Sequence, residues 1–234
     1  MNPSTKYKNI FIDLDKTIWD FDRNTQLTFL EIFEKYELKT LGISDLDSFF
    51  QAYTIINDML WALYRENKIK KEVLTIRRFE LTLQEFGIDD LILATHMAED
   101  FVTLSPLKSI LFPFSHEALT YLNERYTLHI ITNGFEEVQQ KKLDVCDLRK
   151  YFSTITTSEE AGVKKPEAGI FEMALAKAVA KPNESLMIGD DLLVDMAGAR
   201  FTGMDTLFFN PQRLDHNDEL DHEVYSWEGV MKIL

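Results

Sequence analysis

The chain has 234 residues, enough for one large domain or a domain with an insertion, and its 45% of apolar residues excludes wholesale disorder. With 25 Lys and Arg against 39 Asp and Glu, the formal net charge is −14. We therefore expect neither a nucleic-acid polymer nor an anionic membrane as a partner, because both carry the same sign of charge. A small phosphorylated substrate stays possible, because it needs only a local cationic pocket. One cysteine, Cys146, excludes an internal disulfide, and the sequence shows neither a signal peptide nor the roughly 18 apolar residues of a membrane span, so we expect a cytoplasmic protein.

The first apolar run, residues 8–14, predicts a strand that is buried on both faces. The segment after it has no convincing strand and instead carries apolar residues at helical spacing, in the stretches 27–36, 49–64, 71–86 and 91–104. Roughly ninety residues far exceed the ~4–6 residues of an ordinary connection. We therefore interpret residues 18–106 as an inserted helical domain, and residues 1–17 with 107–234 as the core domain.

The second part of the chain alternates between strands and helices. Further apolar runs predict strands at 127–132, 152–156, 185–189 and 206–209. Helical periodicity follows at 135–145, 166–179 and 192–201, and Pro166 suits a first helical position. This alternation predicts an α/β fold, with a parallel sheet and helices on both of its faces.

Polar clusters follow the ends of these strands, where ligands bind in open α/β sheets. Asp13 and Asp15, in the sequence DLDKT, lie two residues apart and project in one direction, so their charges repel. Either a cation relieves this repulsion or one of the two is protonated, and the alternative is a pair of solvated turn residues. After the next strand, Thr132-Asn133-Gly134 offers a hydroxyl and a backbone N–H to a phosphate oxygen, and an ordinary helix cap is the alternative.

Two more clusters complete this set. Lys165, in KKP, either balances carboxylates and phosphate or is solvated. Asp190, Asp191 and Asp195 follow the strand 185–189 and suit a hard cation bound through oxygen, and the alternative is that Asp191 caps a helix and Asp195 lies in its first turn. Each cluster is a weak signal alone, but four of them, each after a strand, indicate one site.

These residues resemble the haloacid dehalogenase superfamily, whose four motifs are matched by DLDKT (13–17), TNG (132–134), Lys165 and GDDLLVD (189–195). The resemblance implies a Rossmann-like core, and it covers the whole chain because the inserted helices are similar to that superfamily's type 1 cap. Phrases of the cap and linkers look like those of its Mg²⁺-dependent pyrimidine 5′-nucleotidases, namely WDFDRN (19–24), INDMLW (56–61), RRF (77–79) and NGFEEVQ (133–139).

The resemblance implies a Mg²⁺-dependent phosphomonoesterase that works through an aspartyl-phosphate. Asp15 favours phosphoryl transfer over dehalogenation at carbon, because a halide leaving group needs no acid. The implied roles are Asp13 as nucleophile, Asp15 as general acid and base, Thr132, Asn133 and Lys165 as phosphate ligands, Asp13, Asp190 and the backbone carbonyl of Asp15 as Mg²⁺ ligands, and Asp191, Asp195 and Thr17 as supporting residues.

The cap is expected to choose the substrate, a nucleoside monophosphate by resemblance. Candidate substrate-selecting residues are Asn57 and Trp61, which share a helix face, with Arg78 and Phe135, and packing within the cap is the alternative. Alternative functions are a sugar-phosphate or phosphoglycolate-type phosphatase, a β-phosphoglucomutase-like enzyme, and a non-catalytic phosphate-binding protein of the same fold. Apolar residues within 210–234 either pack on the core or form a dimer contact, so we expect a monomer or a homodimer.

Overall fold

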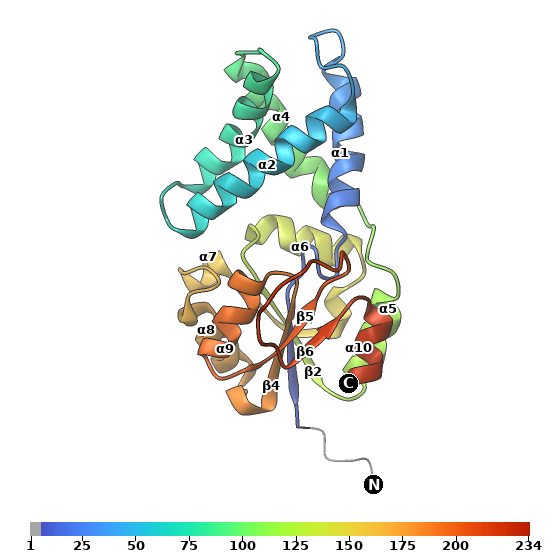
Figure 1. Ribbon diagram of the computed structural model, residues 1–234, viewed down its shortest axis with the longest axis vertical. Helices are drawn as coiled ribbons and strands as arrows, with labels where there is room; N and C mark the ends of the chain where they lie inside the picture. The colour runs from blue at the N-terminus through green and yellow to red at the C-terminus, as the bar shows by residue number, and fades with distance from the viewer. Residues whose placement is uncertain (1–5) are drawn as a thin grey trace. The chain divides into compact units, whose positions relative to one another are not determined.

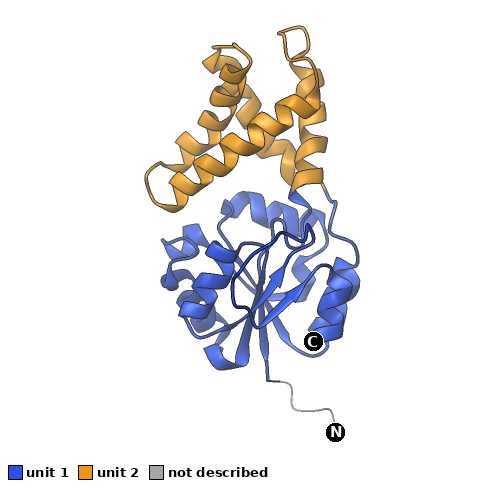
Figure 2. Cartoon of the chain, in the orientation of Figure 1, with its two compact units in different colours: residues 1–21, 109–234 blue, residues 22–108 orange. Residues whose placement is uncertain are grey.

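The computed structural model describes residues 6–234, so the first five residues of the predicted core segment lie outside the described residues. The chain divides into two compact units (Figures 1 and 2). Met1–Phe21 and Ser109–Leu234 form the first, here called the α/β unit, and Asp22–Lys108 form the second, here called the helical unit.

A single parallel sheet of six strands forms the centre of the α/β unit, in the order β3-β2-β1-β4-β5-β6. The strands are β1 (Asn9–Ile12), β2 (Thr127–Thr132), β3 (Phe152–Thr157), β4 (Ser185–Gly189), β5 (Asp205–Phe209) and β6 (His222–Val224). β1 lies between β2 and β4, and Ile12 is in register with both Ile130 and Ile188. The three central strands therefore end at the same edge of the sheet, at the point where the strand order reverses.

Helices cover both faces of this sheet (Figure 1). They are α5 (Ser115–Asn123), α6 (Glu136–Val145), α7 (Ser158–Ala161), α8 (Ala168–Ala178), α9 (Ala197–Phe201) and α10 (Trp227–Ile233). Successive side chains of β1 point to opposite faces: Ile10 and Ile12 join the apolar cluster of α5 and α10, whereas Phe11 joins that of α8 and α9. This confirms the α/β prediction and explains why the strands are continuous apolar runs.

The helical unit has an apolar core of its own. Its helices are α1, which begins at the boundary residue (Phe21–Lys35), α2 (Leu46–Arg65), α3 (Lys71–Glu85) and α4 (Leu91–Leu104). The Phe29 ring lies among the rings of Tyr53, Phe79 and Phe101, with centroid distances of 4.5, 6.1 and 5.3 Å. These helices lie where the apolar periodicity predicts them. None of the helices within residues 6–234 is long and apolar enough to cross a membrane.

Two details differ from the sequence prediction. Pro166 is not the first helical residue, because residues 164–167 form a turn in which the Glu167 N–H donates to the Lys164 carbonyl at 2.8 Å, and α8 begins only at Ala168. The segment 192–201 is not one α-helix, because it opens with a π-helical turn, Leu192–Met196, and continues as α9. The elements α5, β6 and α10 were not predicted from the sequence.

Candidate functional site

The carboxyl ends of β1, β2 and β4 bring the four polar clusters together. Asp13 directly follows β1, and its N–H donates to the Ile188 carbonyl of β4 at 2.9 Å. Thr132 is the last residue of β2, and Asp190 comes directly after β4. Because these parallel strands are in register, the side chains that follow them converge at one edge.

Lys165 lies at the centre of this cluster and is not solvated. Only 2% of its surface is exposed, and its Nζ atom lies 2.5 Å from Asp13 Oδ1, 2.6 Å from Asp195 Oδ1 and 3.0 Å from the Ile131 carbonyl. Three acceptors thus match the three N–H donors of the ammonium group. Burial alone lowers the pKa of Lys165, but the charges of Asp13 and Asp195 outweigh that effect and raise the pKa above its ordinary value.

Three carboxyl groups share this small volume, and when all three are ionised they carry more negative charge than Lys165 neutralises. One oxygen each from Asp13, Asp190 and Asp195 lies within 4.8 Å of the others. Burial raises the pKa of Asp13 to about 7, and the nearby charges of Asp195 and Asp15 add to that rise. Burial, followed by the charges of Asp195 and Asp13, also raises the pKa of Asp190 well above its usual value. A buried set of oxygen ligands with excess negative charge fits a hard divalent cation.

The two other acidic residues of the fourth cluster have structural contacts. Asp191 caps the helical turn that follows it, because its Oδ1 accepts from Leu193 N–H at 2.9 Å and from Val194 N–H at 3.0 Å. Asp195 is buried against Gly189, where an added Cβ would lie 2.4 Å from Asp195 Oδ2. Glycine at position 189 therefore leaves the space that lets Asp195 reach Lys165.

The second and third clusters are joined by paired hydrogen bonds. Asn133 Oδ1 accepts from Lys165 N–H at 2.8 Å, and Asn133 Nδ2 donates to the Lys165 carbonyl at 3.0 Å. Thr132 Oγ1 accepts from Gly134 N–H at 3.0 Å. The loop after β2 thus fixes the backbone that carries the buried lysine.

Thr17 connects the first loop to two distant parts of the α/β unit. Its hydroxyl lies 3.4 Å from Asp190 Oδ1, and its carbonyl accepts a hydrogen bond of 3.0 Å from Trp227 Nε1. Trp227 is fully buried in α10. The sequence analysis included Trp227 only among the apolar residues of 210–234 and did not predict its contact with Thr17, because a contact over 210 positions leaves no local pattern.

Asp15 does not direct its side chain into the carboxylate cluster. Its Oδ1 lies 2.5 Å from Lys142 Nζ, and its Oδ2 accepts from Gln139 Nε2 at 2.8 Å. Both donors belong to α6 and were missed by the sequence analysis.

The four candidate substrate-selecting residues fall in both units. Within the helical unit, Arg78 Nη1 donates to Asn57 Oδ1 at 3.2 Å, and both side chains are buried, so this pair joins α2 to α3. Trp61 packs edge-on against Tyr64, with the ring centroids 5.5 Å apart. Phe135 is a buried residue of the α/β unit that directly precedes α6.

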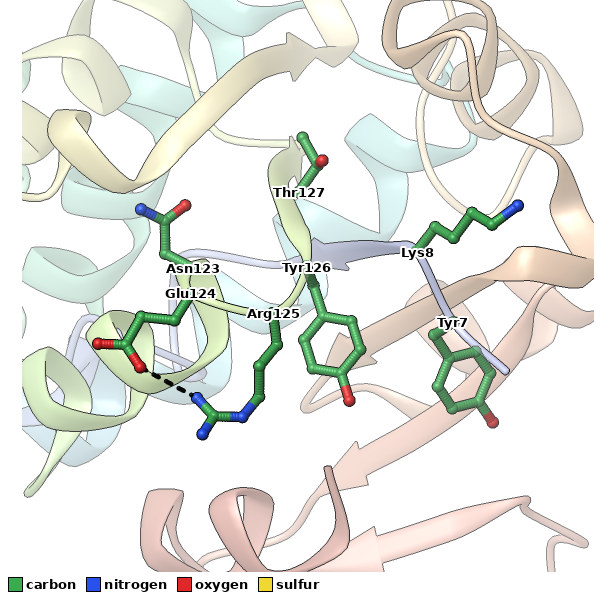
Figure 3. Close-up of a pocket in the computed structure, with 7 residues that line it drawn as sticks. All are labelled: Tyr7, Lys8, Asn123, Glu124, Arg125, Tyr126 and Thr127. Atoms are coloured by element: carbon green, nitrogen blue, oxygen red, sulfur yellow. Dashed lines mark hydrogen bonds and ion pairs between the residues drawn. The ribbon is translucent and has the colours of Figure 1, made fainter. Parts of the chain in front are cut away.

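A separate surface pocket lies at the opposite edge of the sheet (Figure 3). It has a volume of about 480 Å³ and is lined by Tyr7, Lys8, Asn123, Glu124, Arg125, Tyr126 and Thr127. Lys8 and Thr127 lie at the amino ends of β1 and β2. The pocket therefore contains none of the clustered carboxylates, and the chemistry is concentrated at the other edge.

Known proteins resemble this chain over nearly its whole length. The sequence profile of the family described as haloacid dehalogenase-like hydrolase matches residues 10–209. The pyrimidine 5′-nucleotidase PynA of Streptococcus pneumoniae is 30% identical over an alignment of 239 positions, gaps included, that covers 97% of this chain and 95% of that protein. The pyrimidine 5′-nucleotidase YjjG of Escherichia coli is 32% identical over 207 residues, which cover 88% and 87%. Among solved structures, the HAD-hydrolase YfnB of Bacillus subtilis bound to magnesium superimposes with a TM-score of 0.88 at 25% identity, covering 97% of this chain and 98% of that one.

Proposed function

The chain belongs to the haloacid dehalogenase-like hydrolases, and from this premise we propose that it is a Mg²⁺-dependent phosphomonoesterase in which Asp13 receives the phosphoryl group. The observation that carries the proposal is the contrast between Asp13 and Asp15. Asp13 is buried beside Lys165, whereas Asp15 is partly exposed and is held by donors from another element. The position of Asp13 beside the Lys165 ammonium suits a nucleophile that meets a phosphate group, and the partial exposure of Asp15 suits a group that exchanges protons.

Asp13, Asp190 and the backbone carbonyl of Asp15 would hold the Mg²⁺ ion, with Asp195 beside them. The carboxylates of this set are supported by their geometry, because one oxygen each of Asp13, Asp190 and Asp195 lies within 4.8 Å of the others. The part of the Asp15 carbonyl rests on the resemblance to the family, and an all-oxygen donor set suits Mg²⁺. When bound, Mg²⁺ supplies the positive charge that lets a phosphate group approach these carboxylates.

The residues of the chain divide the reaction into two displacements. A carboxylate oxygen of Asp13 attacks phosphorus, the bond from phosphorus to the leaving oxygen breaks, and Asp15 gives that oxygen its proton. Water then attacks the phosphorus of the aspartyl-phosphate, the bond to Asp13 breaks, and Asp15 takes the proton from the water. The Thr132 hydroxyl, the Asn133 N–H and the Lys165 ammonium would hold the remaining phosphate oxygens.

The substrate that we propose is a pyrimidine nucleoside monophosphate, supported by two nucleotidases that match this chain at 30% and 32% identity. The helical segment 18–106 would act as the specificity cap. Trp61 and Phe135 are the proposed substrate-selecting residues, because an aromatic ring can stack on a nucleotide base. The Asn57–Arg78 hydrogen bond would hold α2 and α3 in the orientation that presents Trp61.

The test is phosphate release from nucleoside monophosphates, sugar phosphates and p-nitrophenyl phosphate, in Mg²⁺ and in EDTA. We expect Mg²⁺-dependent release that is strongest with a pyrimidine nucleoside monophosphate. A preference for sugar phosphates would overturn the substrate assignment and keep the mechanism. Release from none of these substrates would overturn the phosphatase assignment.

The covalent step has its own test. Acid quenching of a reaction with ³²P-labelled substrate should leave label on the protein, and hydroxylamine should remove it because an acyl phosphate is its target. Asp13→Asn should carry no label. Label on that variant would place the nucleophile elsewhere.

A further inference from the structure

Both carboxylate oxygens of Asp15 accept from donors of one helix. Lys142 Nζ lies 2.5 Å from Oδ1, and Gln139 Nε2 lies 2.8 Å from Oδ2. Gln139 and Lys142 are three residues apart on α6 and therefore share a face. Their exposed fractions are 0% and 3%, so water competes little for these contacts.

The Gln139 carboxamide is itself fixed in place. Its Nε2 also donates to Thr132 Oγ1 at 2.7 Å, which ties it to the end of β2. A Cβ atom on Gly134 would lie 2.1 Å from the same Nε2 atom. Glycine at position 134 thus provides the space in which Gln139 reaches Asp15.

Lys142 is held on a second side by an aromatic ring. Its ammonium lies 3.9 Å from the centroid of Trp19, a fully buried residue of the loop that carries Asp15. A cation over the face of an indole ring is favoured by the ring quadrupole. The loop therefore contacts Lys142 through both the Asp15 carboxylate and the Trp19 ring.

The buried lysines show a shared pattern. Among the lysines that the structure describes, Lys142 and Lys165 are the two that are buried. Each pairs with one carboxylate of the loop after β1, Lys142 with Asp15 and Lys165 with Asp13. Burying an ammonium group is unfavourable unless its charge is matched. If position 142 served only to pack α6 on the sheet, an apolar residue would be more stable there than lysine.

We propose that Gln139 and Lys142 are positioning residues that fix the Asp15 carboxyl group, which gives a proton to the leaving oxygen and, once ionised, takes one from the attacking water. The inference rests on the proposed function, which makes Asp15 the general acid and base. It assigns to α6 a role that extends beyond covering the sheet. Gly134 belongs to the same device, because it admits Gln139.

Dependence on the leaving group tests this role. An alkoxide leaves only when it is protonated, whereas p-nitrophenolate leaves readily without a proton. Lys142→Met and Gln139→Leu should each lower kcat/KM on the best alkyl phosphate by about 10²-fold, and on p-nitrophenyl phosphate by less than about 10-fold. Gly134→Ala should show the same difference, because it displaces Gln139.

The controls separate positioning from a general loss of structure. Lys141→Met, at an exposed residue of the same helix, should match the wild type on both substrates. In an Asp15→Asn background, Lys142→Met should cause no further loss, because residues that act as a unit are not additive. Thermal unfolding checks that each variant is folded. If Lys142→Met does not fold, the comparison of the two substrates is made with Gln139→Leu.

Equal losses on both substrates, or no loss on either, would overturn the inference and leave the proposed function intact. So would an undiminished effect of Lys142→Met in the Asp15→Asn background. A wild-type protein that hydrolyses neither substrate would overturn the proposed function and this inference together.

Discussion

Replacing Asp13 with Asn should stabilise the metal-free protein above pH 7, although it removes the proposed nucleophile. Burial raises the pKa of Asp13 from 3.8 to about 7. Between these two pH values the folded protein binds a proton that the unfolded chain has lost, so stability falls as the pH rises through this range. Above pH 7 the folded protein carries the full penalty of a buried charge, and a neutral amide of the same shape avoids it.

The rise in pKa sets the size of the effect. At 1.36 kcal/mol for each pKa unit, the penalty is about 4 kcal/mol. This value already includes the attraction of Lys165, and it is an upper limit because Asp190 and Asp195 titrate together with Asp13. For a chain of this size each kcal/mol shifts the melting temperature by about 2–4 °C. We therefore expect Asp13→Asn to melt above the wild type at pH 8.5, by no more than about 8–16 °C.

Thermal unfolding in EDTA at pH 5.5 and at pH 8.5 measures this difference. The advantage of Asp13→Asn should be largest at pH 8.5 and about half as large at pH 5.5, where the unfolded chain has lost a proton that the folded wild type still binds. Asp218→Asn, at an exposed position of the α/β unit, should match the wild type at both pH values. A variant that melts below the wild type at pH 8.5, or by the same margin at both pH values, would refute the assignment of a buried charge to Asp13.

Three further predictions follow from the same site. Mg²⁺ should raise the melting temperature of the wild type more at pH 8.5 than at pH 5.5, because protons compete with the metal for carboxyl groups whose pKa is raised. Asp190→Asn should remove most of this shift, and equal shifts at both pH values would contradict the metal site. Asp15→Asn should lower turnover of alkyl phosphates by about 10²-fold or more and keep the Mg²⁺ shift, whereas loss of that shift would show that the Asp15 carboxylate binds the metal. Trp227→Phe should lower the free energy of unfolding by about 1 kcal/mol in urea titrations, because the Thr17 carbonyl loses its indole donor. An unchanged free energy of unfolding would show that this hydrogen bond contributes nothing to stability.

Much of the fold follows from local sequence patterns. The strands 127–132 and 185–189 lie where their apolar runs predict them, because strands covered on both faces need apolar side chains throughout. The strand β6 has only three residues, and α10 has only seven, too few for the helical spacing of its apolar residues to predict it with certainty. Their positions depend on pairing with β5 and on packing against α5, which are properties of the folded chain.

The site divides in the same way. Asp13, Thr132 and Asp190 could be placed together from the sequence, since parallel strands bring their carboxyl ends to one edge. Gln139 and Lys142 could not, because polar residues on a helix are usually solvated and only tertiary packing turns this face inward. The neighbouring residues Arg77 and Arg78 show the same limit: the rotation of α3 buries Arg78 against Asn57 and leaves Arg77 to pair with Glu80 at the surface.

The division of the chain into a continuous and a discontinuous unit bears on its synthesis by the ribosome. The helical unit, Asp22–Lys108, is complete in one stretch and has its own aromatic core, so it can fold once that stretch has emerged. The strand β1 is made before it and must wait for β2 and β4, and the carbonyl of Thr17 waits for Trp227. The helical unit can therefore fold on the nascent chain well before the α/β unit is complete. Asp13 and Asp15 pair with Lys165 and Lys142 only in the second half of translation, when these lysines have been made.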